Sequence, residues 1–244
     1  MQGSIAHSVR AIYGSEFDAI GYLRRFFDVD YTLPTPERSN FIEALIRSSQ
    51  IPEYFGRTLD AHGKKEQGFI LRMTSKMLGG SSVGLRDIAQ GIHRLGLVLG
   101  SLPDDKRSFA LTASVLVVLR TLQPAAYQEV VAGKRSAAKI LDAIFSGPAL
   151  AELRPTQLGR LFEATLIGGV LEAHGQSETY SELKALSEQM VPKDEPVPEQ
   201  VEHARAVVHL ITELHDSFFG GGIGFKFSVE RLELLSAELK PVSE

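Results

Sequence analysis

The residues best suited to chemistry lie around two glycine-containing segments. Residues 79–84 read GGSSVG and directly precede a predicted helix, whose free backbone N–H groups would attract phosphates. A phosphate-binding P-loop also needs the lysine of GxxxxGK[ST], and this segment has none. The nearest match is Gly133-Lys134-Arg135-Ser136, where Gln128 replaces the first glycine and Arg135 the hydroxyl residue. We interpret that string as a turn between helices, so the sequence contains no P-loop.

Arg86 is expected in the first turn of the helix that follows residues 79–84, with Asp87 beside it. A positive charge there opposes the helix dipole unless an anion is near, which makes Arg86 a candidate phosphate contact. A solvated arginine, or one paired with Asp87, is the more frequent case in such a position. The helix could also pass for a DNA recognition helix, but the net charge of −4 and the missing second basic cluster argue against nucleic-acid binding.

The sequence gives little support for other kinds of catalytic site or for a metal site. The chain has no cysteine, which excludes disulfides, thiolate nucleophiles and cysteine-based zinc sites and is compatible with a reducing compartment. The motifs GxSxG and HExxH are absent. His203, His209 and His215 are six residues apart and rotate around a helix instead of sharing one face. Glu199 lies four residues before His203, and we expect these two to form a surface pair rather than a metal site.

One strand is predicted near the N-terminus. Apolar and polar residues alternate over residues 27–33, which is the period of a strand with one covered face. A lone strand cannot satisfy its own backbone groups, so it needs a partner sheet. Arg24 and Arg25 precede the strand and Asp28 and Asp30 lie on its polar side, which makes these four residues interface candidates. The paired arginines also favour a helix C-terminus without any further role.

The remaining pattern is helical, and the predicted fold is mainly α, a multi-helical bundle with that one strand. Residues 88, 92, 95 and 99 form an apolar stripe, and residues 108–122 are apolar nearly all round, which predicts an enclosed central helix. Residues 191–200 contain three prolines and four charges and should form an extended linker. A long helix should follow over residues 199–216. The longest apolar run, residues 115–119, is far too short to cross a bilayer.

Four segments resemble, in their order and spacing, the C-terminal part of the KAP family of P-loop NTPases. They are residues 6–14 (AHSVRAIYG), 22–34 (YLRRFFDVDYTLP), 84–95 (GLRDIAQGIHRL) and 225–236 (FKFSVERLELLS). The resemblance spans most of residues 4–130 and is weaker near the C-terminus. It implies that residues 1–50 are a remnant of the NTPase core, that 51–190 form a helical lid-like domain, that 191–200 are a linker, and that 201–244 pack on the helical domain.

The resemblance also implies a role for Arg86, which matches a nucleotide-sensing arginine of the lid. Gly84 departs from the family pattern, in which a capping serine is typical. The Walker A and Walker B motifs do not occur in this chain, so it should bind no cofactor by itself, whereas the complete family member uses ATP and Mg²⁺. The expected location is cytoplasmic, with membrane proximity arising through regions outside this sequence.

The sequence therefore predicts the lid and helical region of a KAP-like NTPase, which regulates or assembles an ATPase instead of performing the chemistry. The expected partner is an N-terminal NTPase core or another protein, and a homo-oligomer is compatible with the sequence. Such a chain could be a truncated or split gene product, an isolated C-terminal region, or a free-standing adaptor. The alternative is a non-enzymatic helical module for protein–protein interaction, in which the edge of strand 27–33 recruits the partner.

Overall fold

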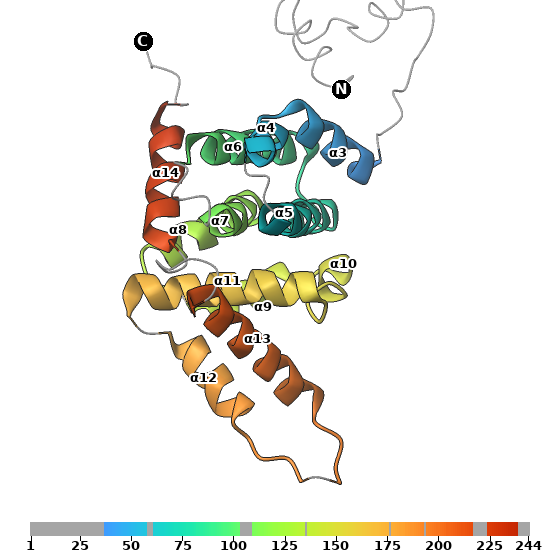
Figure 1. The fold of residues 1–244 in the computed structure, drawn as a ribbon, viewed down its shortest axis with the longest axis vertical. Coiled ribbons are helices and arrows are strands. Elements are labelled where there is room, and N and C mark those ends of the chain that lie inside the picture. The colour runs from blue at the N-terminus through green and yellow to red at the C-terminus, as the bar shows by residue number, and fades with distance from the viewer. Residues whose placement is uncertain are drawn as a thin grey trace, which may run out of the picture. The chain divides into compact units, whose positions relative to one another are not determined.

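The structure is a computed structural model and describes residues 37–57, 61–102, 109–134, 136–175, 177–192, 194–216 and 224–238 (Figure 1). Every regular element in these residues is a helix, which confirms the prediction of a mainly α protein. The predicted strand over residues 27–33 lies outside the described residues. The helices are α3 (Arg38–Ser48), α4 (Ile51–Arg57), α5 (Ala61–Gly79), α6 (Leu85–Ser101), α7 (Ala110–Leu122), α8 (Pro124–Val131), α9 (Ala137–Ile144), α10 (Pro148–Ala151), α11 (Gln157–His174), α12 (Glu178–Ser187), α13 (Glu199–Asp216) and α14 (Phe225–Glu238).

The helices of the bundle are stacked in layers (Figure 1). Helices α3, α4 and α6 form one layer, α5 and α7 the next, and α11 lies across the far side of α5 and α7. Helix α14 runs along one side of the stack and contacts α6, α7 and α11. Helices α12 and α13 pack against each other and project beyond α11 as an antiparallel hairpin.

Helix α7 lies at the centre of the bundle, as its apolar sequence predicts. It contacts α5, α6, α8, α11 and α14, and eleven of its thirteen residues are buried. The two hydroxyl side chains Ser114 and Thr121 donate to the carbonyl oxygens of Ala110 and Val117 one turn earlier. Because their polar groups are satisfied within the helix, both can be buried without an unpaired donor.

The apolar stripe of α6 faces this central helix. Ile88, Ile92, Leu95 and Leu99 are all fully buried or nearly so, as their helical spacing predicts. Helices α6 and α7 approach each other closely at Gly91, where an added Cβ would lie 2.5 Å from the Oγ1 atom of Thr121. The glycine is therefore required by the tertiary contact and not by the helix itself.

The α12–α13 hairpin is held by local hydrogen bonds. Helix α12 begins at the N-cap Ser177, whose side chain accepts from the backbone N–H of Tyr180. The described residues between Ser187 and Glu199 contain no helix, and the backbone N–H of Glu195 donates to the carbonyl of Pro192 across a turn. Helix α13 then runs over the predicted residues 199–216. Helix α14 begins at Phe225, directly after Gly224, whose φ of 69° is left-handed.

Candidate functional site

The predicted site residues divide into two groups. The interface candidates Arg24, Arg25, Asp28 and Asp30 lie outside the described residues, which begin at Glu37. Arg86 lies inside them, in the first turn of α6, and its side chain is exposed. Within the described part of the chain, no hydrogen bond or ion pair is formed by Arg86, and the alternative of a pair with Asp87 is not observed there.

Residues 80–84 form the connection between α5 and α6, one residue shorter than the predicted 79–84 because Gly79 is the last residue of α5. Its geometry depends on neighbouring helices: the Arg38 guanidinium of α3 donates to the carbonyl oxygen of Val83. At Gly80 an added Cβ would lie 2.9 Å from the Cδ2 atom of Leu150, so the turn approaches α10 closely and the Leu150 side chain would have to shift for a larger residue. The N-cap of α6 is Gly84, which supplies no side-chain acceptor for the first-turn N–H groups. The exposed Arg86 and the uncapped helix start therefore lie next to each other.

The second glycine segment is a turn between helices, which confirms that interpretation. Gly133 has a φ of 65°, a left-handed conformation that favours glycine, and it lies between α8 and α9. The start of α9 is capped from another helix, because the hydroxyl of Thr179 in α12 accepts from the backbone N–H of Ala138 at 3.1 Å. The Thr179 hydroxyl also lies 3.0 Å from the Ser136 hydroxyl. This polar contact joins two helix starts and is accounted for by capping.

A buried carboxylate that the sequence did not single out is the strongest polar feature of the interior. Glu163 of α11 is only 2% exposed. Its Oε2 atom lies 3.0 Å from the Nε2 atom of His203 in α13, and its Oε1 atom lies 3.5 Å from a guanidinium nitrogen of Arg154. Arg154 also donates to Asp142 at 2.8 Å. We name these four residues, Asp142, Arg154, Glu163 and His203, the Glu163 cluster.

The electrostatics of the Glu163 cluster favour its charged arginine. Burial alone would disfavour the guanidinium charge, but the hydrogen bond to Asp142 and the proximity of Glu163 outweigh it and raise the pKa of Arg154. The guanidinium also lies 5.6 Å from the centre of the Phe145 ring. These contacts join α9, α11, α13 and the turn before α11, so the cluster fixes the first turns of α13 against α11.

A cavity of about 560 Å³ opens beside the Glu163 cluster. Its lining includes Arg154, Glu163, Glu199 and His203. The expected surface pair of Glu199 with His203 is replaced by the contact with Glu163, because the imidazole of His203 faces α11 across the helix interface. One sequence signal was available: Glu163 lies on the same helical face as Leu166 and Ile167, where a buried polar group needs a partner from another element.

The histidines do not form a metal site in the residues described. His209 pairs with Glu213 one turn later at 3.4 Å, and His203 pairs with Glu163. In the described ranges, no three or more His, Asp or Glu side chains are arranged so that they could hold a metal ion together. In the same ranges, no helix has the length and apolar character required to span a bilayer. Comparisons with protein-family models, curated proteins and solved structures found no match to this chain.

Proposed function

We propose that this chain acts as the helical C-terminal region of a KAP-like P-loop NTPase and regulates or assembles an ATPase core. The observation that carries the proposal is the position of Arg86. Its guanidinium is exposed, has no partner in the described residues, and stands at the uncapped start of α6. The positive charge of Arg86 is repelled by the positive end of the helix dipole at that position. A phosphate bound there would interact favourably with both the guanidinium and the helix start.

The role proposed for Arg86 is to place a positive charge near the nucleotide. Phosphoryl transfer is accelerated mainly by positioning and by positive charge placed where the transferred phosphoryl group develops its charge. An arginine supplied by a neighbouring domain can provide such charge without any other catalytic group. A core with its own lysine and Mg²⁺ would therefore perform the reaction, and Arg86 would sense or stabilise its nucleotide.

The test is ATP turnover by a KAP-family core that contains Walker A and Walker B motifs, measured with and without this chain. Addition of the chain should increase turnover, and Arg86→Ala should remove the increase while leaving the fold intact. Lys139→Ala is the matched control, because Lys139 is an exposed cation on α9, a different helix of the bundle. An unchanged rate on addition of the chain, or equal effects of the two substitutions, would refute the proposal.

The second candidate is a helical interaction module without a nucleotide role. A separate observation favours it, the projection of the α12–α13 hairpin with an exposed methionine near its end. This function requires a protein complex whose affinity is independent of ATP and of Arg86→Ala. A complex that forms only with ATP would argue against it and for the first proposal.

A further inference from the structure

The end of the α12–α13 hairpin combines exposed apolar side chains with negative charge. We name residues 188–199 the hairpin tip. Met190 is 95% exposed and Val197 42% exposed, and the described residues contain one further exposed large hydrophobic side chain, Leu234 at 61%. An exposed methionine is a flexible apolar group suited to filling a pocket on a partner surface.

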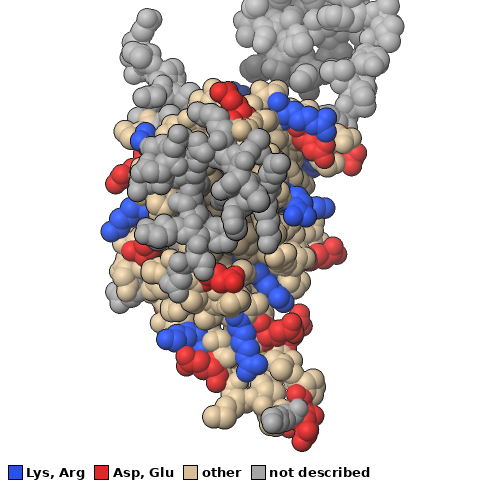
Figure 2. Space-filling model, in the orientation of Figure 1, with Lys and Arg blue, Asp and Glu red and all other residues tan. Residues whose placement is uncertain are grey.

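The hairpin tip is also acidic. It contains Glu188, Asp194, Glu195 and Glu199 against the single Lys193, so its net charge is −3, compared with −4 for all 244 residues. Figure 2 shows Asp and Glu residues, in red, at the end of the hairpin. A surface of this kind is complementary to an apolar groove with basic residues around it.

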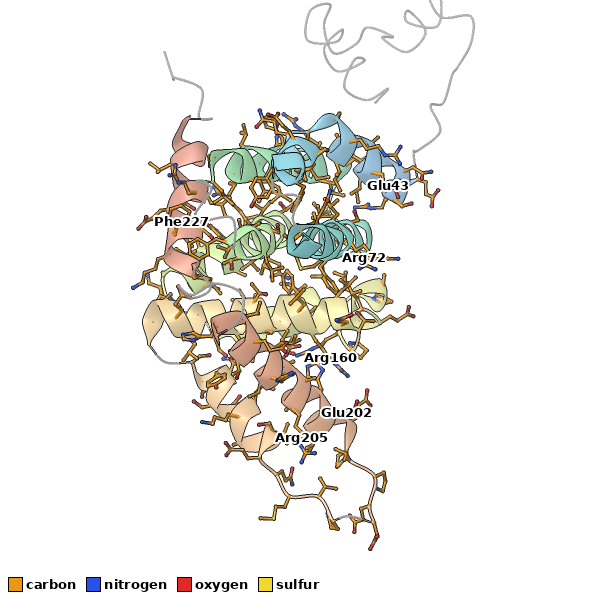
Figure 3. All side chains as sticks on the ribbon, in the orientation of Figure 1. Glu43, Arg72, Arg160, Glu202, Arg205 and Phe227 are labelled. Carbon is orange, nitrogen blue, oxygen red and sulfur yellow. The ribbon has the colours of Figure 1, made fainter. Side chains whose placement is uncertain are left out.

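The hairpin tip is held in place before any partner binds. The guanidinium of Arg205 in α13 donates to the carbonyl oxygens of Ser187 and Gln189 at 3.1 and 3.0 Å, which fixes the residue directly before Met190. Figure 3 labels Arg205 on the hairpin. The prolines at positions 192, 196 and 198 restrict the backbone further. Both features lower the entropy that binding must remove.

A groove of matching character lies between α3, α5 and α10. It has a volume of about 920 Å³, and its apolar lining includes Ile46, Leu71 and Leu153. The charged residues that line it are the cations Arg38, Arg47, Arg72 and Lys76 and the anions Glu37 and Glu43. Figure 3 labels Glu43 and Arg72 on the neighbouring edges of α3 and α5. The groove therefore has a net positive charge.

Several groove cations have charge that is not neutralised within the described residues. Arg72 donates to a backbone carbonyl, that of Gly68, and Lys76 has no hydrogen-bond or ion-pair partner in the part of the chain described. Only Arg47 forms an ion pair there, with Glu43 at 2.9 Å. An incoming carboxylate would thus meet available positive charge at α5.

The hairpin tip projects from the side of α11 that faces away from α3 and α5, two of the helices that line the groove (Figure 1). His203, near the start of α13, holds the hairpin against α11 through its contact with Glu163, so the tip stays on that side of α11. The two surfaces can meet only between two molecules.

We propose that the hairpin tip of one copy docks in the groove between α3 and α5 of a second copy. Met190 occupies the apolar part of the groove, and the tip carboxylates face Arg72 and Lys76. Because the two surfaces differ, the contact is head-to-tail and produces rings or open chains rather than a closed two-fold dimer. This interaction does not depend on the nucleotide role of Arg86, and either proposal can fail alone.

The experiment measures the molar mass of the full chain by analytical ultracentrifugation over a range of concentrations. The wild type should associate at low ionic strength and dissociate at about 0.5 M salt, where surface charges are screened. Met190→Asp should raise the dissociation constant at least about tenfold, as loss of an interface anchor does. Leu234→Asp is the matched control, because Leu234 is exposed on α14, outside both surfaces, and association should be unchanged.

A mixing experiment makes the test specific for the head-to-tail contact. The Arg72→Glu/Lys76→Glu double variant should be monomeric, like Met190→Asp, with circular dichroism spectra matching the wild type. An equimolar mixture of these two variants retains one intact tip and one intact groove, so it should form heterodimers and nothing larger. A monomeric wild type at low salt, association unaffected by Met190→Asp, equal loss with Leu234→Asp, or no dimer in the mixture would each overturn the proposal.

Discussion

Replacement of Glu163 by glutamine should destabilise the bundle because it removes a buried negative charge. The two side chains have nearly the same volume, so the effect reports on charge and not on packing. The substitution keeps the volume of the side chain but removes its charge, while Glu163 is 2% exposed and lies 3.0 Å from His203. Arg154 would keep Asp142 at 2.8 Å, so the arginine is not left without a carboxylate. The loss therefore falls mainly on the contact with His203.

The expected magnitude follows from the two contacts of Glu163. A hydrogen bond to a charged group contributes about 1.5–3 kcal/mol, and the 3.5 Å approach of Arg154 adds less. We expect Glu163→Gln to lower the free energy of unfolding by about 2 kcal/mol, which corresponds to a fall in Tm of about 4–8 °C for a chain of this size. His203→Ala should cost a similar amount, since it leaves the Glu163 carboxylate buried beside Arg154 alone.

Urea unfolding followed by circular dichroism measures the double-mutant cycle. The double variant should lose less than the two single variants together, with a coupling energy of about 1 kcal/mol or more for residues in contact. Glu182→Gln is the control, because Glu182 is exposed on α12 and its replacement should change stability by less than about 0.5 kcal/mol. Additive effects of Glu163→Gln and His203→Ala, or a stability of Glu163→Gln equal to that of the control, would refute the assigned contact.

Three further predictions concern other parts of the bundle. Burial and the adjacent Glu233 carboxylate raise the pKa of Tyr127, so stability should fall by about 1.4 kcal/mol per pH unit once the pH exceeds about 10, the pKa of an unfolded tyrosine. Tyr127→Phe should remove that slope in urea titrations at alkaline pH, and an unchanged slope would contradict the assignment. Gly91→Ala should cost about 1–3 kcal/mol through its contact with Thr121, despite the higher helix propensity of alanine, and Thr121→Ala should recover part of the loss in thermal melts. Thr156→Ala should cost about 1 kcal/mol, because the Thr156 side chain caps α11 by accepting from the N–H of Gly159; a Tm equal to that of the wild type would exclude this cap.

Much of the helical architecture could be predicted from local patterns. The apolar stripe of α6 and the all-round apolar character of α7 identified one helix with a single buried face and one enclosed helix, and both descriptions are confirmed. The boundaries of α13 agree with the predicted residues 199–216. Such patterns reveal which face of a helix is buried because that face repeats every 3.6 residues. They do not reveal which other helix covers it.

The candidate sites were predictable only in part, for the same reason. The exposed position of Arg86 at a helix start follows from its neighbours in the sequence. His203, however, was expected to pair with Glu199 one turn away, whereas its partner is Glu163, forty residues earlier in the chain. Local spacing identifies contacts within a helix, and it carries no information about a residue on another helix.

The sequence by itself determined that this protein is mainly helical, which faces of α6 and α7 are buried, that a P-loop is absent, and that the hairpin tip is acidic. Each of these properties depends on composition or on near neighbours in the chain. Only the tertiary structure decided that Glu163 is buried against His203 and that the tip projects from the side of α11 that faces away from α3 and α5. Both results depend on how the helices pack, because packing brings together residues that are distant in sequence.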